Sequence, residues 1–398
     1  MAKQNKPAIR FKGFTDAWEQ RKVGEVSESY SGGTPSVGVK EYYGGQIPFI
    51  RSAEINSEIT ELFLTEEGLK NSSARLVAVG DILYALYGAT SGEVGRARLK
   101  GAINQAILAI KPHTDYDSEY LAQWLRKSKH SIIDTYLQGG QGNLSGTIVK
   151  ELSVDFPSLK EQKAIGGFFR QLDNLITLHQ RKYDKLQVLK KAMLEKMFPK
   201  NGSSVPEIRF KGFTDAWEQR KFSDLYAPLV ERNSDLLPYN KTLSVATMTY
   251  KTDGNGAADS SLANYKRLRT GDIAFEGHTS KSFRYGRFVL NDVGDGIMSP
   301  RFSALRPLAQ MPTNFWKYYI HYEPIMRKIL VASTKAGTMM NELVIDEFLK
   351  SSVLVPSIEE QTRIGSILKN IDNLITLHQR ELEKLQNIKK SMLEKMFV

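Results

Sequence analysis

The stretch IRFKGFTDAWEQRK occupies residues 9–22 and returns at residues 208–221, unchanged at all 14 positions. The same offset of 199 residues carries residues 172–198 onto residues 371–397, where 20 of 27 positions are identical. Both of these helix-like segments contain DNLITLHQR and end in MLEKMF. Self-similarity at a fixed period indicates an internally repeated architecture. The chain is therefore two copies of one unit of about half its length.

The segments between the repeats are dissimilar. Residues 23–151 and 222–348 align only in sparse landmarks, such as Gly-Asp-Ile at 80–82 and again at 271–273. A duplication followed by drift of surface loops would explain this divergence. Drift, however, should also have changed the exposed polar residues of the repeats. We therefore favour a division of labour, in which the identical parts meet the same kind of partner twice and the different parts meet two targets.

Each dissimilar segment carries the signals of a mixed α/β globule. In the first half, runs typical of strands cover residues 46–51, 81–87 and 102–110, and a helix is expected over residues 118–136. In the second half, strands are expected at residues 241–247, 272–276, 287–290 and 302–306, followed by a helix over residues 312–330. The expected domains are two globules, at residues 1–157 and 201–355, each followed by a repeated helical region, at 158–200 and 356–398.

Apolar residues recur with spacings of three and four in both helical regions, which is the signature of a coiled coil. The expected pairing residues are Ile165, Leu172, Ile176, His179, Leu186 and Met193 in the first region, and Ile364, Ile371, Ile375, His378, Leu385 and Met392 in the second. Two such helices in one chain should pair with each other, and a pseudo-two-fold relation would make them antiparallel. For the two histidines, a ring at the edge of the seam is favoured over a polar register-setting pair.

Composition limits the possible functions. The formal net charge of +11 suits a polyanionic partner, although many basic proteins bind none. The absence of cysteine excludes disulfides and thiol catalysis. No apolar stretch could span a bilayer, and the N-terminus lacks the apolar core of a signal peptide, so a cytoplasmic location is expected.

Several motifs together resemble a known family. Each helix begins after a Pro-Ser-x-x-Glu-Gln motif, at residues 157–162 and 356–361. The first globule has Gly-Gly-Thr-Pro-Ser at 32–36 and Tyr-Gly-Ala-Thr-Ser-Gly at 87–92. In their duplicated order, these motifs resemble the specificity subunits of type I restriction-modification enzymes over essentially the whole chain. The second globule departs from the pattern, because residues 225–240 replace the Gly-Gly-Thr-Pro opening.

The resemblance implies a target-recognition domain in each half, which reads one part of an asymmetric, bipartite site in double-stranded DNA. The helices would set the spacing between the two parts. Two adenine methyltransferase subunits would dock on the repeats, and endonuclease subunits with translocase activity would complete the restriction system. S-adenosylmethionine, Mg²⁺ and ATP are expected on those partner subunits, and no cofactor or metal is expected on this chain.

The residues themselves offer no catalytic motif. The chain lacks an Asn/Asp-Pro-Pro-aromatic box, a phosphate-binding loop and a Pro-Asp nuclease lead-in, and its six histidines show no metal-ligand spacing. A non-catalytic DNA-binding protein is therefore expected. The main alternative is a protein-interaction scaffold with an incidental basic surface, and a lesser one is a nuclease with an unrecognised site.

Candidates for DNA reading combine suitable chemistry with a loop position, since Arg pairs with guanine and Asn or Gln with adenine in the major groove. In the first globule they are Thr34, Ser36, Arg51, Tyr87, Thr90, Ser91, Arg96, Asn104 and Gln105. In the second globule they are His278, Lys281, Arg284, Tyr285, Arg287, Ser299 and Arg301. For a single basic residue, a phosphate contact or a solvated side chain is the commoner role.

Overall fold

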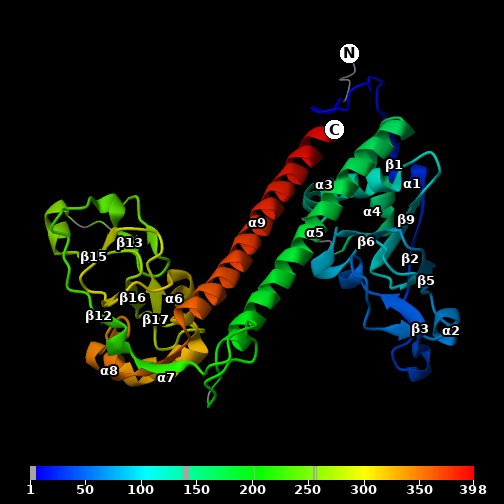
Figure 1. The fold of residues 1–398 in the computed structure, drawn as a ribbon. Coiled ribbons are helices and arrows are strands. Elements are labelled where there is room, and N and C mark those ends of the chain that lie inside the picture. Colours follow the sequence, from blue (N-terminus) through cyan, green and yellow to red (C-terminus); the bar gives the residue numbers. More distant parts are fainter. Residues whose placement is uncertain (1–5, 138–142, 201, 254–255, 257) are drawn as a thin grey trace. The chain divides into compact units, whose positions relative to one another are not determined.

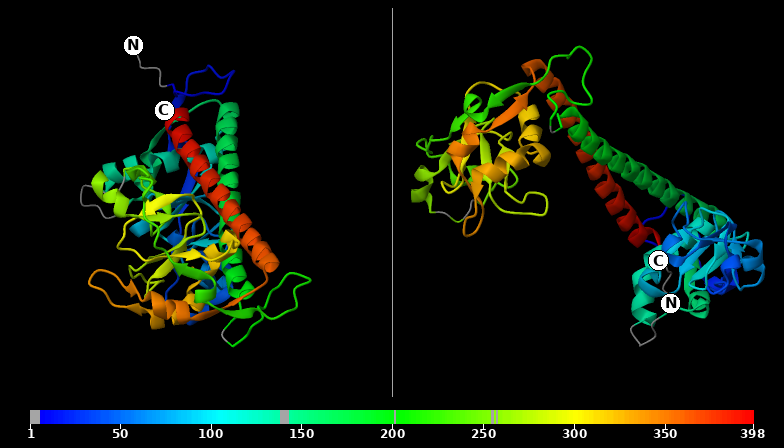
Figure 2. Two further views of the ribbon diagram at one scale, coloured as in Figure 1. Left: turned by 60° about the vertical axis from the view of Figure 1, so that its left-hand side comes forward. Right: turned by 90° about the horizontal axis from the view of Figure 1, so that it is seen from below.

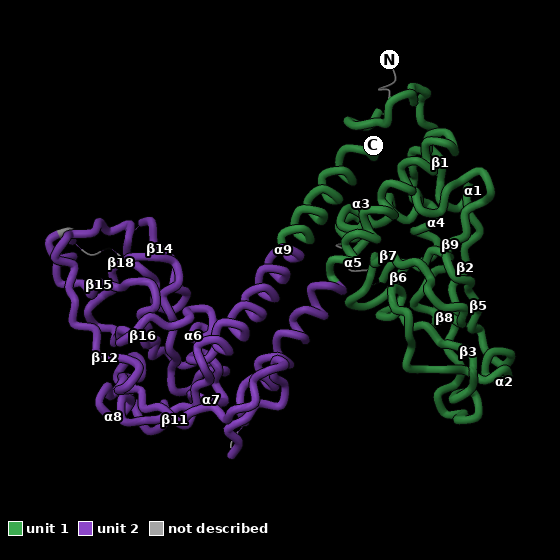
Figure 3. Tube along the Cα trace, viewed as in Figure 1, with its two compact units in different colours: residues 1–180, 380–398 green, residues 181–379 purple. Residues whose placement is uncertain are grey.

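The structure is a computed structural model that describes residues 6–137, 143–200, 202–253, 256 and 258–398. The chain divides into two compact units, Met1–Gln180 with Arg380–Val398, and Arg181–Gln379 (Figure 3). The boundary crosses two helices of 39 residues each, α5 (Leu159–Met197) and α9 (Ile358–Met396). Each runs without interruption (Figures 1 and 2). The two long helices are confirmed, and each unit contains parts of both.

Two four-stranded sheets form most of the first globule. One has the order β2 (Ser27–Ser31), β9 (Ile107–Pro112), β6 (Ile82–Ala85) and β7 (Val94–Arg96). The other has the order β4 (Phe63–Leu64), β3 (Tyr43–Ile50), β8 (Gly101–Ile103) and β5 (Arg75–Val77). The helices are α1 (Val23–Val26), α2 (Glu66–Lys70), α3 (Ser118–Tyr136) and α4 (Gly146–Glu151).

The prediction of a helix over residues 118–136 is confirmed, whereas one continuous strand over 102–110 is wrong. The chain turns between β8 and β9, and the two strands belong to different sheets. The Asn104 side chain accepts a hydrogen bond from the Ala106 amide at 3.2 Å, and the Asn104 carbonyl accepts one from Ile107 at 3.2 Å. Such bonds from an Asn side chain to the following backbone favour a turn over a strand.

The second globule has one comparable sheet. Its order is β12 (Tyr226–Pro228), β19 (Ala304–Pro307), β16 (Ile273–Glu276) and β17 (Arg287–Leu290). Among the described residues of this globule, three strand pairs accompany it. They are β13 (Leu243–Ser244) with β14 (Thr249–Tyr250), β15 (Lys266–Leu268) with β18 (Gly296–Met298), and β20 (Thr334–Lys335) with β21 (Glu342–Leu343). A short helix, α8 (Ile345–Lys350), precedes the return to the repeat.

Two predictions for the second globule need correction. The strand expected over residues 241–247 is only two residues long, because the chain turns back at Met248, whose φ of 48° is left-handed. The helix expected over residues 312–330 is two helices, α6 (Thr313–Tyr319) and α7 (Glu323–Ser333). Pro324 lies in the first turn of α7, where its missing N–H leaves no bond unmade, whereas inside a continuous helix it would break one.

The repeated segments share several contacts between the two units, and we call them the repeated shell. They are residues 9–22, 153–180 and 380–397 in the first unit, and residues 208–221, 352–379 and 181–198 in the second. In each unit two short antiparallel strands close the globule, β1 (Glu19–Lys22) with β10 (Ser153–Phe156) and β11 (Glu218–Lys221) with β22 (Ser352–Val355). In each unit a buried glutamate binds the arginine of the IRF segment, Glu161 with Arg10 and Glu360 with Arg209, both at 2.7 Å.

The end of each long helix completes the core of the globule that belongs to the other copy. In the first unit the ring of Phe397 lies 5.1 Å from that of Tyr120 and 5.8 Å from that of Phe169. In the second unit Phe198 lies 6.0 Å from Phe315 and 5.1 Å from Tyr319. The sequence showed that the two segments ending in MLEKMF match, but not that their ends exchange globules.

Within the first unit, α5 and α9 run antiparallel. Asp173 of α5 pairs with Lys389 of α9 at 2.5 Å. Phe169, which precedes Asp173 on α5, stacks on Phe397, which follows Lys389 in the chain. Moving backward along α5 therefore corresponds to moving forward along α9. The equivalent ion pair in the second unit joins Asp372 and Lys190 at 2.6 Å. The predicted antiparallel helices are thus present.

The predicted pairing residues differ in burial. Those that are buried are Ile165, Leu172, Ile364, Ile371 and Ile375. Those that are partly buried are Ile176, His179, Leu186, Met193, His378, Leu385 and Met392. The fully buried residues lie in the half of each helix that follows its own globule. The individual contributions of these residues to pairing stay predictions.

Candidate nucleic-acid interface

Strand topology brings several loops of the first globule to one edge. Both β2 and β6 run antiparallel to β9, so their ends lie beside its start. The parallel pair β3 and β8 ends at Ile50 and Ile103, directly before Arg51 and the turn that leads into β9. We call residues 32–36, 51, 86–92 and 104–106 the first loop edge. All of the first globule's candidates except Arg96 lie on it.

Two segments of this edge meet through polar side chains. The Thr34 hydroxyl donates to Gln105 Oε1 at 2.5 Å, and the Gly33 amide donates to the Ile103 carbonyl at 3.2 Å. A Cβ on Gly32 would lie 1.8 Å from the Ile103 carbonyl oxygen, so only glycine allows this close approach. Thr34, Ser36 and Gln105 are exposed, and Asn104 is partly buried. Uncharged hydrogen-bonding groups therefore dominate this part of the edge.

The loop after β6 is held in place by hydrogen bonds to backbone carbonyl groups. The Leu86 amide donates to the Ala106 carbonyl at 2.8 Å, which joins this loop to the turn before β9. Ser91 is buried, and its hydroxyl donates to the Leu86 carbonyl at 3.3 Å. Thr90 and Tyr87 are partly buried. Ser91 thus holds the loop's shape, and its contact with DNA stays a prediction.

The two arginines predicted for the first globule are engaged by protein groups. Arg51 binds Glu54 at 2.8 Å and Glu61 at 2.7 Å. Burial alone would raise the pKa of Glu54, but hydrogen bonds from Arg51 and from backbone amides hold it at about 2. Arg96 donates to the Ser118 hydroxyl at 2.8 Å, and desolvation lowers the pKa of its guanidinium. A base contact by either arginine would require these bonds to be exchanged.

The second globule has a corresponding edge. Residues 277–286 connect β16 to β17, and residues 299–303 connect β18 to β19. We refer to residues 277–287, which include Arg287 at the start of β17, as the 277–287 loop. The Phe275 amide donates to the Ser303 carbonyl at 2.8 Å, so the two loops lie side by side. Arg287 donates from Nη2 to the carbonyl of Ala246, in the turn between β13 and β14, at 2.9 Å. We call residues 246–248, 277–287 and 299–303 the second loop edge.

The second loop edge is cationic. Lys281, Arg284 and Arg301 are exposed, and within the described part of the chain none forms an ion pair. Arg287 lies over the Phe283 ring at 5.0 Å and is partly buried. Exposed, unpaired guanidinium and ammonium groups are the groups that bind phosphates and guanine.

The remaining candidates of the second globule are less free. His278 is exposed, but its Nδ1 lies 2.5 Å from Oε1 of the buried Glu276. Tyr285 is partly buried and packs against the globule's core, and Ser299 is also partly buried. The structure therefore brings all seven candidates of the second globule to one edge. Of these candidates, the basic residues Lys281, Arg284 and Arg301 are both exposed and without an ion-pair partner among the described residues.

Sequence reasoning missed one further segment at each edge. The Asn341 amide donates to the Gly277 carbonyl at 2.9 Å, and in the first globule the Leu144 amide donates to the Leu86 carbonyl at 3.0 Å. Both bonds attach a later segment to the first residue after the central strand. No signal marked these segments, because the contact is made by the backbone and the two globules do not align there.

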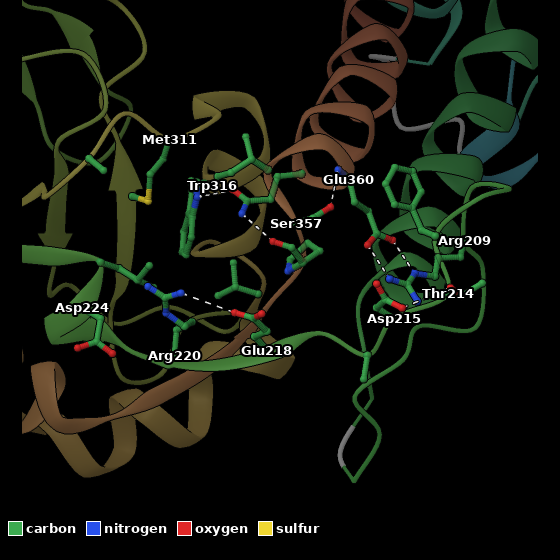
Figure 4. A pocket seen from close by; sticks show the side chains of 18 of the residues that line it. Arg209, Thr214, Asp215, Glu218, Arg220, Asp224, Met311, Trp316, Ser357 and Glu360 are labelled. Atoms are coloured by element: carbon green, nitrogen blue, oxygen red, sulfur yellow. Dashed lines mark hydrogen bonds and ion pairs between the residues drawn. The ribbon is translucent and has the colours of Figure 1, made fainter.

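A cavity of about 410 Å³ in the second unit is lined by residues outside the second loop edge. Figure 4 shows side chains that line it. Its wall comes mostly from the repeated shell, including Arg209, Arg220 and Glu360, and the second globule adds Trp316. The Trp316 indole N–H donates to Gln361 Oε1 at 3.0 Å. In the first unit the same glutamine position, Gln162, accepts from the Asp117 amide at 2.8 Å. The repeated shell therefore accommodates different globules by changing the partner of one glutamine.

Among the described residues, no group of three or more His, Asp or Glu side chains could hold a metal ion. None of the described helices combines the length and the apolar character that crossing a membrane requires.

Fold and loop edges together define a class of protein: an internally duplicated recognition protein, with a constant shell and two dissimilar loop edges. Residues 15–188 and 280–387 match the family model of the type I restriction modification DNA specificity domain. This match covers more than half of the chain, which therefore belongs to that family. As a specificity subunit it is a non-catalytic component of a type I restriction-modification system.

Named relatives agree over nearly the full length. The type I restriction enzyme MjaIX specificity subunit of Methanocaldococcus jannaschii is 24% identical, over 95% of this chain and 92% of that protein. The MjaVIII specificity subunit of the same organism is 21% identical, over 94% and 91%. The crystal structure of a type I restriction-modification S subunit from M. genitalium covers 99% of both chains, with a TM-score of 0.66 and 14% identity. This last likeness shows the fold alone.

Proposed function

We propose that this chain binds a bipartite, asymmetric site in double-stranded DNA and positions adenine methyltransferase and endonuclease subunits on it. Each loop edge would read one half of the site. The observation that carries the proposal is the contrast between a repeated shell with matched contacts and two loop edges with different chemistry. Identical surfaces suit two copies of one partner, whereas dissimilar edges suit two different base sequences.

The chemistry of the edges supports DNA as the target. Lys281, Arg284 and Arg301 can neutralise phosphates or, in the case of arginine, bind guanine through two hydrogen bonds. Asn104 and Gln105 offer the amide groups that bind adenine. A protein-interaction scaffold would not need exposed, unpaired cations at the end of a sheet. The scaffold alternative instead predicts duplex binding that is weak and has no sequence preference.

The long helices carry a surface suited to a partner protein. Leu175 and Leu178 on α5 are 43% and 46% exposed, and their repeats on α9, Leu374 and Leu377, are 45% and 51% exposed. Leucines spaced by three residues lie on one helix face. The same exposed pair in both copies fits two equal methyltransferase subunits. S-adenosylmethionine, Mg²⁺ and ATP would be held by partner subunits, and endonuclease subunits would join that complex.

Exchange of one globule tests the proposal. Residues 23–151 would be replaced by the matching segment of a relative, with β1 and β10 kept. Lys22 pairs with Ser153 in the ladder between these strands, so both ends of the exchanged segment are held next to each other. Methyl-adenine mapping should then show one half-site changed and the other intact. The matched exchange of residues 222–350 should change only the other half-site.

Loss of both half-sites in either exchange would contradict independent reading. Weak duplex binding without sequence preference would favour the scaffold instead. Metal-dependent DNA cleavage by the purified chain alone would reveal an unrecognised nuclease site.

A further inference from the structure

We propose that the loop of the β20–β21 hairpin, residues 336–341, is an additional DNA-reading element of the second globule. In this element Met339 contacts a base edge beside Arg301, and Asn341 positions the loop of residues 277–287. The inference rests on the proposed function and deepens it, because it adds a specificity-determining segment that the sequence did not indicate.

The hairpin loop is fixed to the second loop edge by two bonds from one residue. The Asn341 amide donates to the Gly277 carbonyl at 2.9 Å, and its side-chain amide donates to the Arg284 carbonyl at 3.2 Å. A Cβ on Gly277 would lie 2.0 Å from the Asn341 carbonyl oxygen, so the two backbones pass as closely as glycine permits. The start and the middle of the 277–287 loop are thus both held by Asn341.

The hairpin loop itself is tightly folded. Thr334 pairs with Leu343 and Lys335 with Glu342 across its base. A Cβ on Gly337 would lie 2.3 Å from the Met340 carbonyl oxygen, so the chain folds back sharply at this glycine. A loop anchored at its base and at Asn341 presents its tip in a defined position. Preorganisation of this kind is what a reading element needs, because less conformational entropy is lost on binding.

Met339 is the exposed apolar group at this tip. Its side chain is 73% exposed, and the guanidinium of Arg301 lies 3.9 Å from its sulfur. An exposed apolar side chain held beside an unpaired arginine places a methyl-contacting group next to a guanine-binding group. In the major groove thymine offers a methyl group and guanine two acceptors. The pair therefore suits adjacent thymine and guanine contacts.

The first globule gives independent support for the arrangement. There the Leu144 amide donates to the Leu86 carbonyl at 3.0 Å, the equivalent of the bond from Asn341 to Gly277. Asn143, directly before Leu144, is exposed. The same backbone attachment therefore occurs in two globules whose sequences do not align in this region.

Substitution of Met339 in the full-length chain, assembled with the methyltransferase of its own system, tests the reading role. Met339→Ala should weaken the preference at one base pair of the second half-site by roughly fourfold, the value of one buried methyl group. Met339→Leu should retain most of that preference. Val331→Ala is the matched control, because Val331 is 49% exposed on α7 and lies outside the loop edge. Methyl-adenine mapping and binding to a randomised half-site are the measurements.

Substitution of Asn341 tests the positioning role. Asn341→Ala removes the side-chain N–H donor to the Arg284 carbonyl and introduces no charge at the loop edge. Base preference should relax at positions read by the 277–287 loop, while the salt dependence of binding stays that of the original chain, since no cation is lost. A purely structural role would lower the melting temperature and leave base preference unchanged.

The outcomes separate the two levels of the argument. If the original chain shows no preferred second half-site, the proposed function itself fails. If it shows one, and Met339→Ala and Asn341→Ala both retain every base preference, the hairpin proposal alone is overturned.

Discussion

The two loop edges occupy the same place in their globules, yet their chemistry differs. The first presents mainly Thr34, Ser36 and Gln105, and its Arg51 is bound by two carboxylates. The second presents Lys281, Arg284 and Arg301 without ion-pair partners among the described residues. In the repeated shell that carries both edges, the buried ion pair and the two closing strands occur in each unit. The difference teaches that this fold keeps its anchoring shell constant, whereas the globules, including the loops at their strand ends, vary.

The largest effect is expected from separating the copies. A half-chain of residues 1–200 lacks Met396 and Phe397, which are buried in the core of the first globule. Its own Met197 and Phe198 are identical in type and can fill that place in a second molecule. Burying each such side chain stabilises the fold by about 1.5–3 kcal/mol. We therefore expect a two-fold dimer.

Sedimentation of the half-chain across micromolar concentrations checks this expectation. Assembled with its methyltransferase, the dimer should modify a palindrome of the first half-site. A folded monomer would contradict the exchange of helix ends between copies.

The next largest effect is expected from replacing the one phenylalanine that each globule receives from the long helix of the other copy. Phe397→Ala should destabilise the first globule by about 3–5 kcal/mol, and Phe198→Ala the second by a similar amount. The reason is that each ring is at most 3% exposed in the core of the globule built by the other copy. Hydrogen exchange resolved by globule is the measurement. Loss of protection in the globule of the same copy would reverse this assignment.

A smaller effect should separate the loop edges by their salt dependence. Replacing Lys281, Arg284 and Arg301 with alanine should lower the slope of log K against log salt by about 1 for each phosphate contact removed. Gln105→Ala at the first edge should leave the slope unchanged and cost about 1–3 kcal/mol of discrimination, if it reads adenine.

Binding to duplexes with one intact half-site, at several salt concentrations, measures both. Equal slopes for the two sets of variants would show that the charge difference between the edges plays no part in binding.

The smallest effect concerns acid. Hydrogen bonds from Arg269 and Arg306 lower the pKa of Glu231 in the second globule from 4.5 to about 2. A carboxylate with a lowered pKa stabilises the fold above pH 4.5, and this contribution is lost as the pH falls toward 2. Because Glu231 is partly exposed, the contribution should be at most about 1 kcal/mol.

Glu231→Gln should remove this part of the acid sensitivity from the second globule only. Glu54→Gln should act in the same way on the first, since the pKa of Glu54 is also about 2. Hydrogen exchange of each globule at pH 6 and pH 3 compares them, and an effect of Glu231→Gln on the first globule would contradict this assignment.

The sequence by itself determined the duplication, the two long helices, the α/β class and most of the loop residues that gather at each edge. These features depend on residues that are close together in the sequence: identical segments, the spacing of apolar residues, and Gly-rich turns between apolar runs. The helix at Ser118–Tyr136 is an example, because its apolar face and its Asp117 cap are adjacent in the chain.

Only the tertiary structure decided which groups meet. Arg10 and Glu161 are 151 residues apart, and Asp173 and Lys389 are 216 apart, so no local pattern reveals either pair. The same holds for the helix ends that exchange globules and for the Asn341 hairpin. The physical reason is that residue type sets what a side chain can bind, whereas the path of the backbone sets which partner reaches it first.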